Sequence, residues 1–132
     1  MVNFAALAPP LAAFTFVHPN RAAAADNRRA AVLRFAVAQA GLVHGLAGYF
    51  DATLAGDVHV SILPSTHTAA MASWFPLFFP LREPVYARAG DVVEVRMWRC
   101  VSAAKVWYEW AVTAPAITPI HNPGGRSYYV GL

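Results

Sequence analysis

Cysteine and charge are both scarce in this sequence, and each shortage excludes a class of protein. The 132 residues contain one cysteine, Cys100, so no internal disulfide framework can form and a reducing compartment fits best. Only 13% of the residues are charged, and the arginines are scattered, with Arg28 and Arg29 as the one adjacent pair. The net charge of +3 therefore gives no basic stripe, and we expect no direct nucleic-acid binding.

Long apolar runs are also missing, although 58% of the residues are hydrophobic. Much of that content is alanine, and a spanning helix needs about 18 to 20 consecutive apolar residues, so no membrane span is predicted. The first ten residues lack the basic start of a cleavable signal. A chain of 132 residues has material for one hydrophobic core, and we expect one domain over residues 1–132.

Motifs that carry catalytic chemistry are absent as well. There is no Gly-x-Ser-x-Gly elbow, no paired acidic site and no glycine-rich loop that follows a strand. The histidines are widely spaced along the sequence, and none is separated from Cys100 or from another histidine by the number of residues typical of metal ligands. This spacing favours structural roles for His18, His44, His59, His67 and His121. The sequence therefore predicts no catalytic residue, no metal ligand and no cofactor-binding residue in this chain.

What the sequence does contain is apolar and polar alternation, which is typical of half-buried strands. The alternating sets are residues 33–37, 58–62, 93–97 and 106–112. The polar or small residues 101–105 predict a hairpin between the last two sets, and a final strand is expected at 128–130 after the turn 122–125. Only residues 22–31 suggest a short helix or a loop. The expected fold class is all-β and antiparallel.

The segment 71–81, MASWFPLFFPL, carries four aromatic rings and two prolines without a charge. Pro76 and Pro80 remove backbone donors and disfavour helix at the residue before each, so we expect an extended, irregular segment. A segment this apolar must be covered. It either lines a cleft or docks a second domain, or it closes a β-barrel core as a loop.

Short runs along the whole chain carry a family resemblance, in order and with few or no insertions. They are residues 18–21 (HPNR), 44–50 (HGLAGYF), 66–67 (TH), 71–81, 95–100 (VRMWRC), 105–115 (KVWYEWAVTAP), 121–123 (HNP), 125–128 (GRSY) and 131–132 (GL). With these runs the chain resembles the C-terminal β-barrel of the type II protein arginine methyltransferase 5 family. The departures, mostly alanines, concentrate in the first forty residues and around 101–104.

The resemblance implies an antiparallel β-barrel that lacks its first strands and its dimerisation arm, as a fragment of a larger enzyme. The S-adenosylmethionine site and the glutamates that grip the substrate guanidinium belong to an upstream Rossmann domain, and an N-terminal TIM barrel binds a WD-repeat partner. Trp74 matches the tryptophan that lines the substrate-arginine tunnel, with Ser73 and Phe75 beside it as substrate-binding residues. An indole face can hold a planar guanidinium by stacking and cation–π attraction.

The implied function is the substrate-side and assembly domain of an enzyme that transfers methyl groups from S-adenosylmethionine to protein arginine, giving symmetric dimethylarginine. Histones and splicing proteins as substrates, homo-oligomers, and a cytoplasmic and nuclear location follow from the same resemblance, and the chain alone should be inactive. Two alternatives stay open. One is a free-standing β-barrel module that binds a peptide or small ligand, and the other is a non-functional truncated product.

The remaining tryptophans are expected to be packing residues. Trp110 shares the apolar face of its strand with Tyr108 and Val112, which predicts a core position. Trp98 and Trp107 lie on neighbouring strands, each on the face opposite to the apolar one, and a cross-strand aromatic pair is expected there.

Overall fold

The computed structural model describes residues 4–21, 26–71 and 74–132, and within these ranges it contains strands and a single turn of 3-10 helix. The chain divides into two compact units, one of residues 1–43 and 82–132 and one of residues 44–81. In chain order the elements are β1 (Arg29–Ala36), β2 (Gly41–Gly48), β3 (Asp51–Thr53), β4 (His59–Ser61), β5 (Leu77–Ala87), β6 (Val92–Val101), β7 (Lys105–Ala114), η1 (Pro123–Gly125) and β8 (Val130–Gly131).

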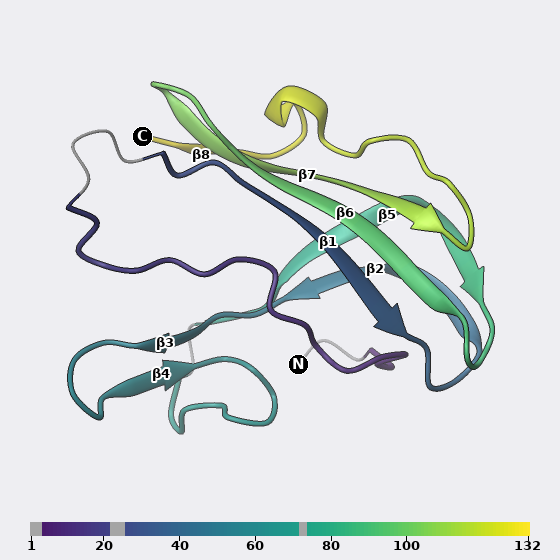
Figure 1. Ribbon diagram of the computed structural model, residues 1–132, viewed down its shortest axis with the longest axis horizontal. Helices are drawn as coiled ribbons and strands as arrows, with labels where there is room; N and C mark the ends of the chain where they lie inside the picture. The colour runs from purple at the N-terminus through teal and green to yellow at the C-terminus, as the bar shows by residue number, and fades with distance from the viewer. Residues whose placement is uncertain (1–3, 22–25, 72–73) are drawn as a thin grey trace. The chain divides into compact units, whose positions relative to one another are not determined.

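The first unit is built on an antiparallel sheet with the strand order β1-β6-β7-β8, whose first three strands run side by side in Figure 1. Its register places Leu33 opposite Val95, and Val95 opposite Val112. Val95 and Val112 are fully buried and Leu33 is nearly so. Because alternate residues of a strand face the same side, the apolar positions predicted from the sequence form one core face.

Three details of this sheet were expected from the sequence, and two of them differ in position. The hairpin between β6 and β7 is confirmed, with the Ser102 N–H donating to the Lys105 carbonyl. The last strand, β8, begins at Val130 and pairs with Lys105 and Val106, so it lies later than the predicted 128–130. Residues 29–31 belong to β1, so the expected helix or loop over 22–31 is wrong there, and residues 22–25 lie outside the described ranges.

The N-terminal segment of the first unit lies across one end of this core face. The ring of Phe14 stacks on Tyr108 with centroids 6.3 Å apart. The guanidinium carbons of Arg29 and Arg99 lie 4.9 Å and 5.2 Å from the centroid of Phe16. Phe14 and Phe16 therefore cover the end of the core face at which Arg29, Arg99 and Tyr108 stand in place of the aliphatic side chains found further along the strands.

The remaining strands form two short sheets, β2-β5 and β3-β4. The ladders of the described residues thus give three separate antiparallel sheets, and the all-β class is confirmed without a closed barrel appearing in the strand pairing. Strand β5 continues through Pro80 and Pro84, so the expected irregularity over 77–81 is wrong, although the segment is extended. Proline is tolerated because each strand of a two-stranded sheet has an edge that needs no ladder donors.

Strand β2 was not predicted, because it contains three glycines and little alternation. A Cβ atom at Gly45 would lie 2.5 Å from the Phe79 carbonyl oxygen and 2.7 Å from the Phe78 ring, and one at Gly48 would lie 2.7 Å from the Phe79 ring. Positions 45 and 48 face opposite sides of the strand, as do positions 78 and 79. Each glycine therefore leaves room for one phenylalanine ring of β5.

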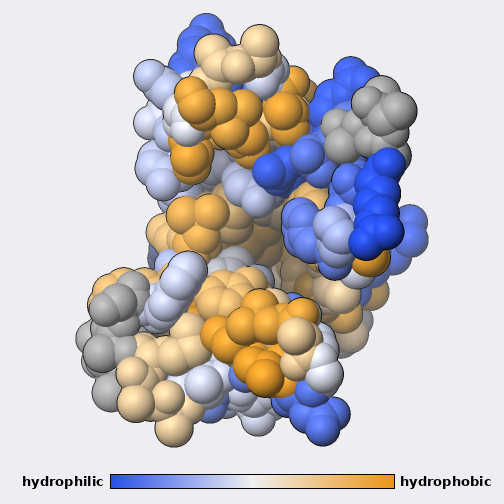
Figure 2. All heavy atoms as spheres, turned by 90° about the vertical axis from the view of Figure 1, so that its left-hand side faces the viewer, coloured by the Kyte–Doolittle hydropathy of each residue, from blue (hydrophilic) through white to orange (hydrophobic). Residues whose placement is uncertain are grey.

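Many large apolar side chains remain exposed, and Figure 2 shows hydrophobic patches on the face of the molecule turned to the viewer. In the second unit these exposed residues include Leu54, Val58, Trp74, Phe75 and Phe78. No helix in the described ranges is long and apolar enough to cross a membrane.

Candidate functional site

The candidate site is the start of the aromatic segment in the second unit, just before β5. Trp74 is 59% exposed and Phe75 is 71% exposed. The third predicted site residue, Ser73, lies outside the described residues. Large aromatic side chains are usually buried, so two adjacent exposed rings mark a surface that is available for binding.

Trp74 packs against one aromatic neighbour while more than half of its surface stays exposed. It meets the ring of Phe50 in a T-shaped arrangement, with centroids 5.3 Å apart and planes inclined by 72°. Such a contact contributes about 0.5 to 1.5 kcal/mol beyond burial. An exposed indole of this kind can bind a planar cation by stacking and cation–π attraction.

Phe50 is itself positioned by the loop that surrounds Ser61. Its carbonyl accepts hydrogen bonds from the Ile62 N–H at 3.0 Å and from the Ser61 hydroxyl at 3.4 Å. Ser61 is fully buried, and its hydroxyl lies 2.9 Å from that of Thr66 and accepts the Leu63 N–H at 3.0 Å. The support for Trp74 therefore comes from a buried, hydrogen-bonded loop, which sequence patterns alone did not reveal.

The same loop brings together residue types that are found in hydrolases, but not in a hydrolase arrangement. The Thr66 hydroxyl donates to Asp51 Oδ2 at 3.4 Å, and Asp51 Oδ1 lies 2.7 Å from His59 Nε2. The Asp51–His59 contact lies on strands β3 and β4, whereas the Ser61 hydroxyl is fully buried and bonded to Thr66 and the backbone. A nucleophile must be reachable by substrate and activated by a base, so this chain of hydrogen bonds fastens the β3-β4 hairpin instead.

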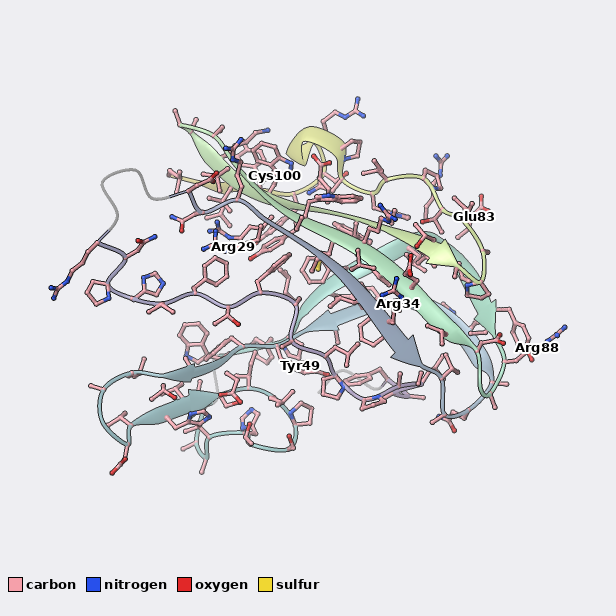
Figure 3. The ribbon with its side chains drawn as sticks, viewed as in Figure 1. Arg29, Arg34, Tyr49, Glu83, Arg88 and Cys100 are labelled. Atoms are coloured by element: carbon pink, nitrogen blue, oxygen red, sulfur yellow. The ribbon has the colours of Figure 1, made fainter. Side chains whose placement is uncertain are left out.

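The strand that follows Trp74 anchors the segment. Phe79 is only 7% exposed, whereas its neighbours Leu77 and Phe78 are 39% and 58% exposed. The apolar segment 71–81 is therefore not exposed throughout, because Phe79 points inward beside Gly48. Tyr49, labelled in Figure 3, is partly buried, and this burial raises the pKa of its phenol.

In the first unit, His121 has a structural role, as expected. Its Nε2 accepts the Arg82 N–H at 3.0 Å, its Nδ1 lies 3.2 Å from the Trp110 carbonyl oxygen, and its ring stacks on Trp110 with centroids 5.6 Å apart. The next residue, Asn122, is 7% exposed and donates to the carbonyls of Tyr108 and Tyr128. Within the described part of the chain no group of three or more potential ligands could hold a metal ion.

The other tryptophans are packing residues. Trp110 is 7% exposed, so its predicted core position is confirmed. The register places Trp98 opposite Glu109 and Trp107 opposite Cys100. Trp98 and Trp107 are therefore diagonal neighbours on adjacent strands, within the reach of aromatic side chains. Trp107 also donates its indole N–H to Glu109 at 2.7 Å and packs against Gly125.

Comparison with known families decides what this arrangement belongs to. The family model described as the PRMT5 oligomerisation domain matches residues 1–130. The chain belongs to the PRMT5 oligomerisation domain family. This result confirms the resemblance on which Trp74, Ser73 and Phe75 were chosen, while their role in binding substrate stays a prediction.

Relatives of this PRMT5 oligomerisation domain are similar over almost all of its length. It is 56% identical over 133 residues to "Protein arginine N-methyltransferase 5" of Oryza sativa subsp. indica and 51% identical over 130 residues to the protein of the same name from Xenopus laevis. It is 34% identical over 134 residues to "Protein arginine N-methyltransferase skb1" of Schizosaccharomyces pombe. These alignments cover 98%, 98% and 87% of this chain, but only 20%, 20% and 21% of the relatives. The chain thus spans about one fifth of the length of the curated relatives it matches.

Two titratable groups on the outer face of the main sheet have shifted pKa values. A hydrogen bond from the Thr113 hydroxyl, at 2.8 Å, holds the pKa of Glu94 below its ordinary value, and the ion pair with Arg34 adds to the effect. Partial burial raises the pKa of the Cys100 thiol, with a smaller contribution from the Glu109 carboxylate. Because the thiolate is the reactive form of cysteine, Cys100 is not an activated nucleophile.

Proposed function

We propose that this chain is the assembly and substrate-side region of a protein arginine N-methyltransferase, and that it acts within a longer chain. The observation that carries the proposal is the family match over residues 1–130, together with relatives at 56% and 51% identity that are named as arginine methyltransferases. The longer enzyme would transfer methyl groups to protein arginines, with symmetric dimethylarginine as product.

Trp74 is the residue through which this region would meet the substrate. Trp74 is 59% exposed and packs against the Phe50 ring, so its exposed indole surface would stack on a guanidinium group. Arginine is planar and permanently charged, and stacking with cation–π attraction contributes about 0.5 to 2 kcal/mol while leaving the terminal nitrogen free. The backbone groups of Ser73 and Phe75, on either side, would hydrogen-bond the substrate peptide.

The methyl donor, S-adenosylmethionine, does not fit any feature of the described residues. A nucleoside cofactor of this kind is usually held by a glycine-rich turn between a strand and the start of a helix. In β2 the space beside Gly45 and Gly48 is taken by phenylalanine rings and that beside Gly41 by Leu7, and Gly124 and Gly125 lie in the short η1 turn. Donor binding and the acidic grip on the guanidinium would therefore be supplied by another part of the longer protein, the Rossmann domain of the family.

Assembly is the second part of the proposal. The family description names oligomerisation, and exposed apolar side chains such as Leu77 and Phe78 favour contacts with another chain or domain. We propose homo-oligomers of the longer enzyme, substrates that present arginine in histones and splicing proteins, and a cytoplasmic and nuclear location. The WD-repeat partner of the family would bind elsewhere in the longer chain.

One alternative function is favoured by a specific observation. The exposed Trp74 and Phe75 side chains would also suit a free-standing module that binds a peptide or small ligand. A thermal shift of the isolated chain with an arginine-containing peptide would favour that function.

The proposed function is tested by methyl transfer. A longer chain that contains this region should methylate an arginine peptide and give symmetric dimethylarginine by mass spectrometry, whereas the matched lysine peptide should stay unmodified. Absence of transfer to arginine by a folded, donor-binding enzyme would contradict the proposal.

A further inference from the structure

A groove on the first unit lies between the second half of β5 and the segment that follows β7. It has a volume of about 320 Å³, and all the residues that line it belong to this unit. They include Arg82, Glu83 and Tyr86 of β5, and Ile117 of the following segment. Trp74 belongs to the second unit and does not line it, so the groove is a different feature from the candidate substrate site.

Hydrogen bonds hold both walls of this groove in place. The Arg82 N–H donates to His121 Nε2 at 3.0 Å, which ties β5 to the opposite wall. That wall is tied to β7 in turn, because the Thr118 N–H donates to the Val112 carbonyl at 3.0 Å and the Thr118 hydroxyl accepts the Val112 N–H at 2.9 Å. The chain therefore forms the groove without help from a partner.

Two unpaired opposite charges stand next to each other in the groove. Arg82 and Glu83 are both exposed, and neither side chain has a hydrogen bond or an ion pair with another described residue. Apolar surface accompanies them, since Tyr86 is 57% exposed and Ile117 is 85% exposed. The groove thus presents a cation, an anion and apolar side chains together.

The backbone of β5 does not favour an added strand as the occupant. Arg82 directs its N–H to His121, and Pro84, two residues further on, lies on the same edge of the strand and has no N–H. This edge therefore cannot supply a regular ladder of hydrogen bonds to an extended peptide. A partner must be recognised mainly through side chains.

The side chains of the groove are complementary to themselves. In a two-fold symmetric interface both copies use the same surface, so Arg82 of each copy can meet Glu83 of the other. Tyr86 and Ile117 would supply apolar contact, while the two ion pairs would fix the orientation. We propose that this surface, named here the Arg82–Glu83 groove, binds the same groove of a second copy of this chain. The proposal rests on the assembly part of the proposed function, since the family description names oligomerisation.

Charge reversal in differently tagged copies of the full chain tests this pairing. Capture of one tag should retain the wild-type chain that carries the other tag. Arg82→Glu and Glu83→Arg should each weaken retention of their own kind by about tenfold, because both symmetry-related contacts become repulsive. A mixture of the two variants should restore retention, because two negative charges then face two positive charges. Both side chains are exposed and unpaired, so both variants should keep the fold.

Arg88→Glu is the matched control, because Arg88 directly follows β5 but does not line the groove, and Figure 3 shows it apart from Glu83. It should leave retention unchanged. Equal retention in every combination would overturn the proposal by showing that another surface, such as that of Phe78, joins the copies. A loss that the mixture does not restore would overturn it too. The assay involves no methyl transfer, so either failure would leave the arginine-methylation test of the proposed function unaffected.

Discussion

Replacing Trp74 by alanine in a longer methyltransferase chain that contains this region should separate activity from stability. Trp74 is 59% exposed and packs against Phe50 in a T-shaped contact, so its replacement should lower the free energy of unfolding by only about 1 kcal/mol. Loss of cation–π stacking should weaken arginine binding by about 2-fold to 30-fold, corresponding to about 0.5 to 2 kcal/mol. Loss of the wall that orients the guanidinium should lower kcat by a factor on the order of a hundred.

The assay is steady-state methylation of an arginine peptide, with donor affinity and thermal unfolding measured on the same preparations. Phe75→Ala is the matched control, because its side chain is 71% exposed and the contribution proposed for it comes from the backbone. Trp74→Phe should restore part of the turnover through its smaller ring. Near-normal turnover in Trp74→Ala, or a loss of activity matched by global unfolding, would refute the reasoning.

Three further predictions concern packing and association. Trp110→Ala should destabilise the first unit by about 3 to 5 kcal/mol, seen in thermal unfolding, because Trp110 is 7% exposed and its removal leaves a cavity. Gly45→Ala should lower the free energy of unfolding by about 1 to 3 kcal/mol, because the new methyl group overpacks against the Phe79 carbonyl. Gly131→Ala is the control, since the new methyl group there has open space around it and should not lower stability. Equal effects of the two substitutions would contradict the fit of β2 to β5. The isolated chain should sediment as oligomers because Phe78 and other apolar side chains are exposed, and a cooperative monomer would favour the free-standing binding module.

The strands of the main sheet could be predicted because one face of each is buried. Because of that burial, apolar residues such as Leu33, Val95 and Val112 recur at every second position along their strands. The hairpin between β6 and β7 was predicted from the small and polar residues between these two strands. Strand β2 carries no such signal. Gly45 and Gly48 are explained by the rings of Phe78 and Phe79 on β5, so the reason for them can be seen only when both strands are considered together.

Some features of the candidate site could also be predicted from the sequence, and others could not. Trp74 was selected through the family resemblance, which the family match has since confirmed, but its exposure could not be predicted from an apolar segment that looked ready for burial. The support from Ser61 through Phe50 depends on a hydrogen bond between residues that are 11 positions apart in the sequence. The shared contact of Arg29 and Arg99 with Phe16 likewise depends on the register of β1 and β6, which places the two arginines opposite each other.

The central claim is that the methyl donor is bound by another domain of the longer enzyme and not by this region. Calorimetry with S-adenosylmethionine tests it most directly. The isolated chain should show no cofactor binding and should not methylate an arginine peptide, while a longer chain that contains the family's donor-binding domain should bind one cofactor per chain with an affinity unchanged by Trp74→Ala. Stoichiometric binding of S-adenosylmethionine by the isolated chain would contradict the account.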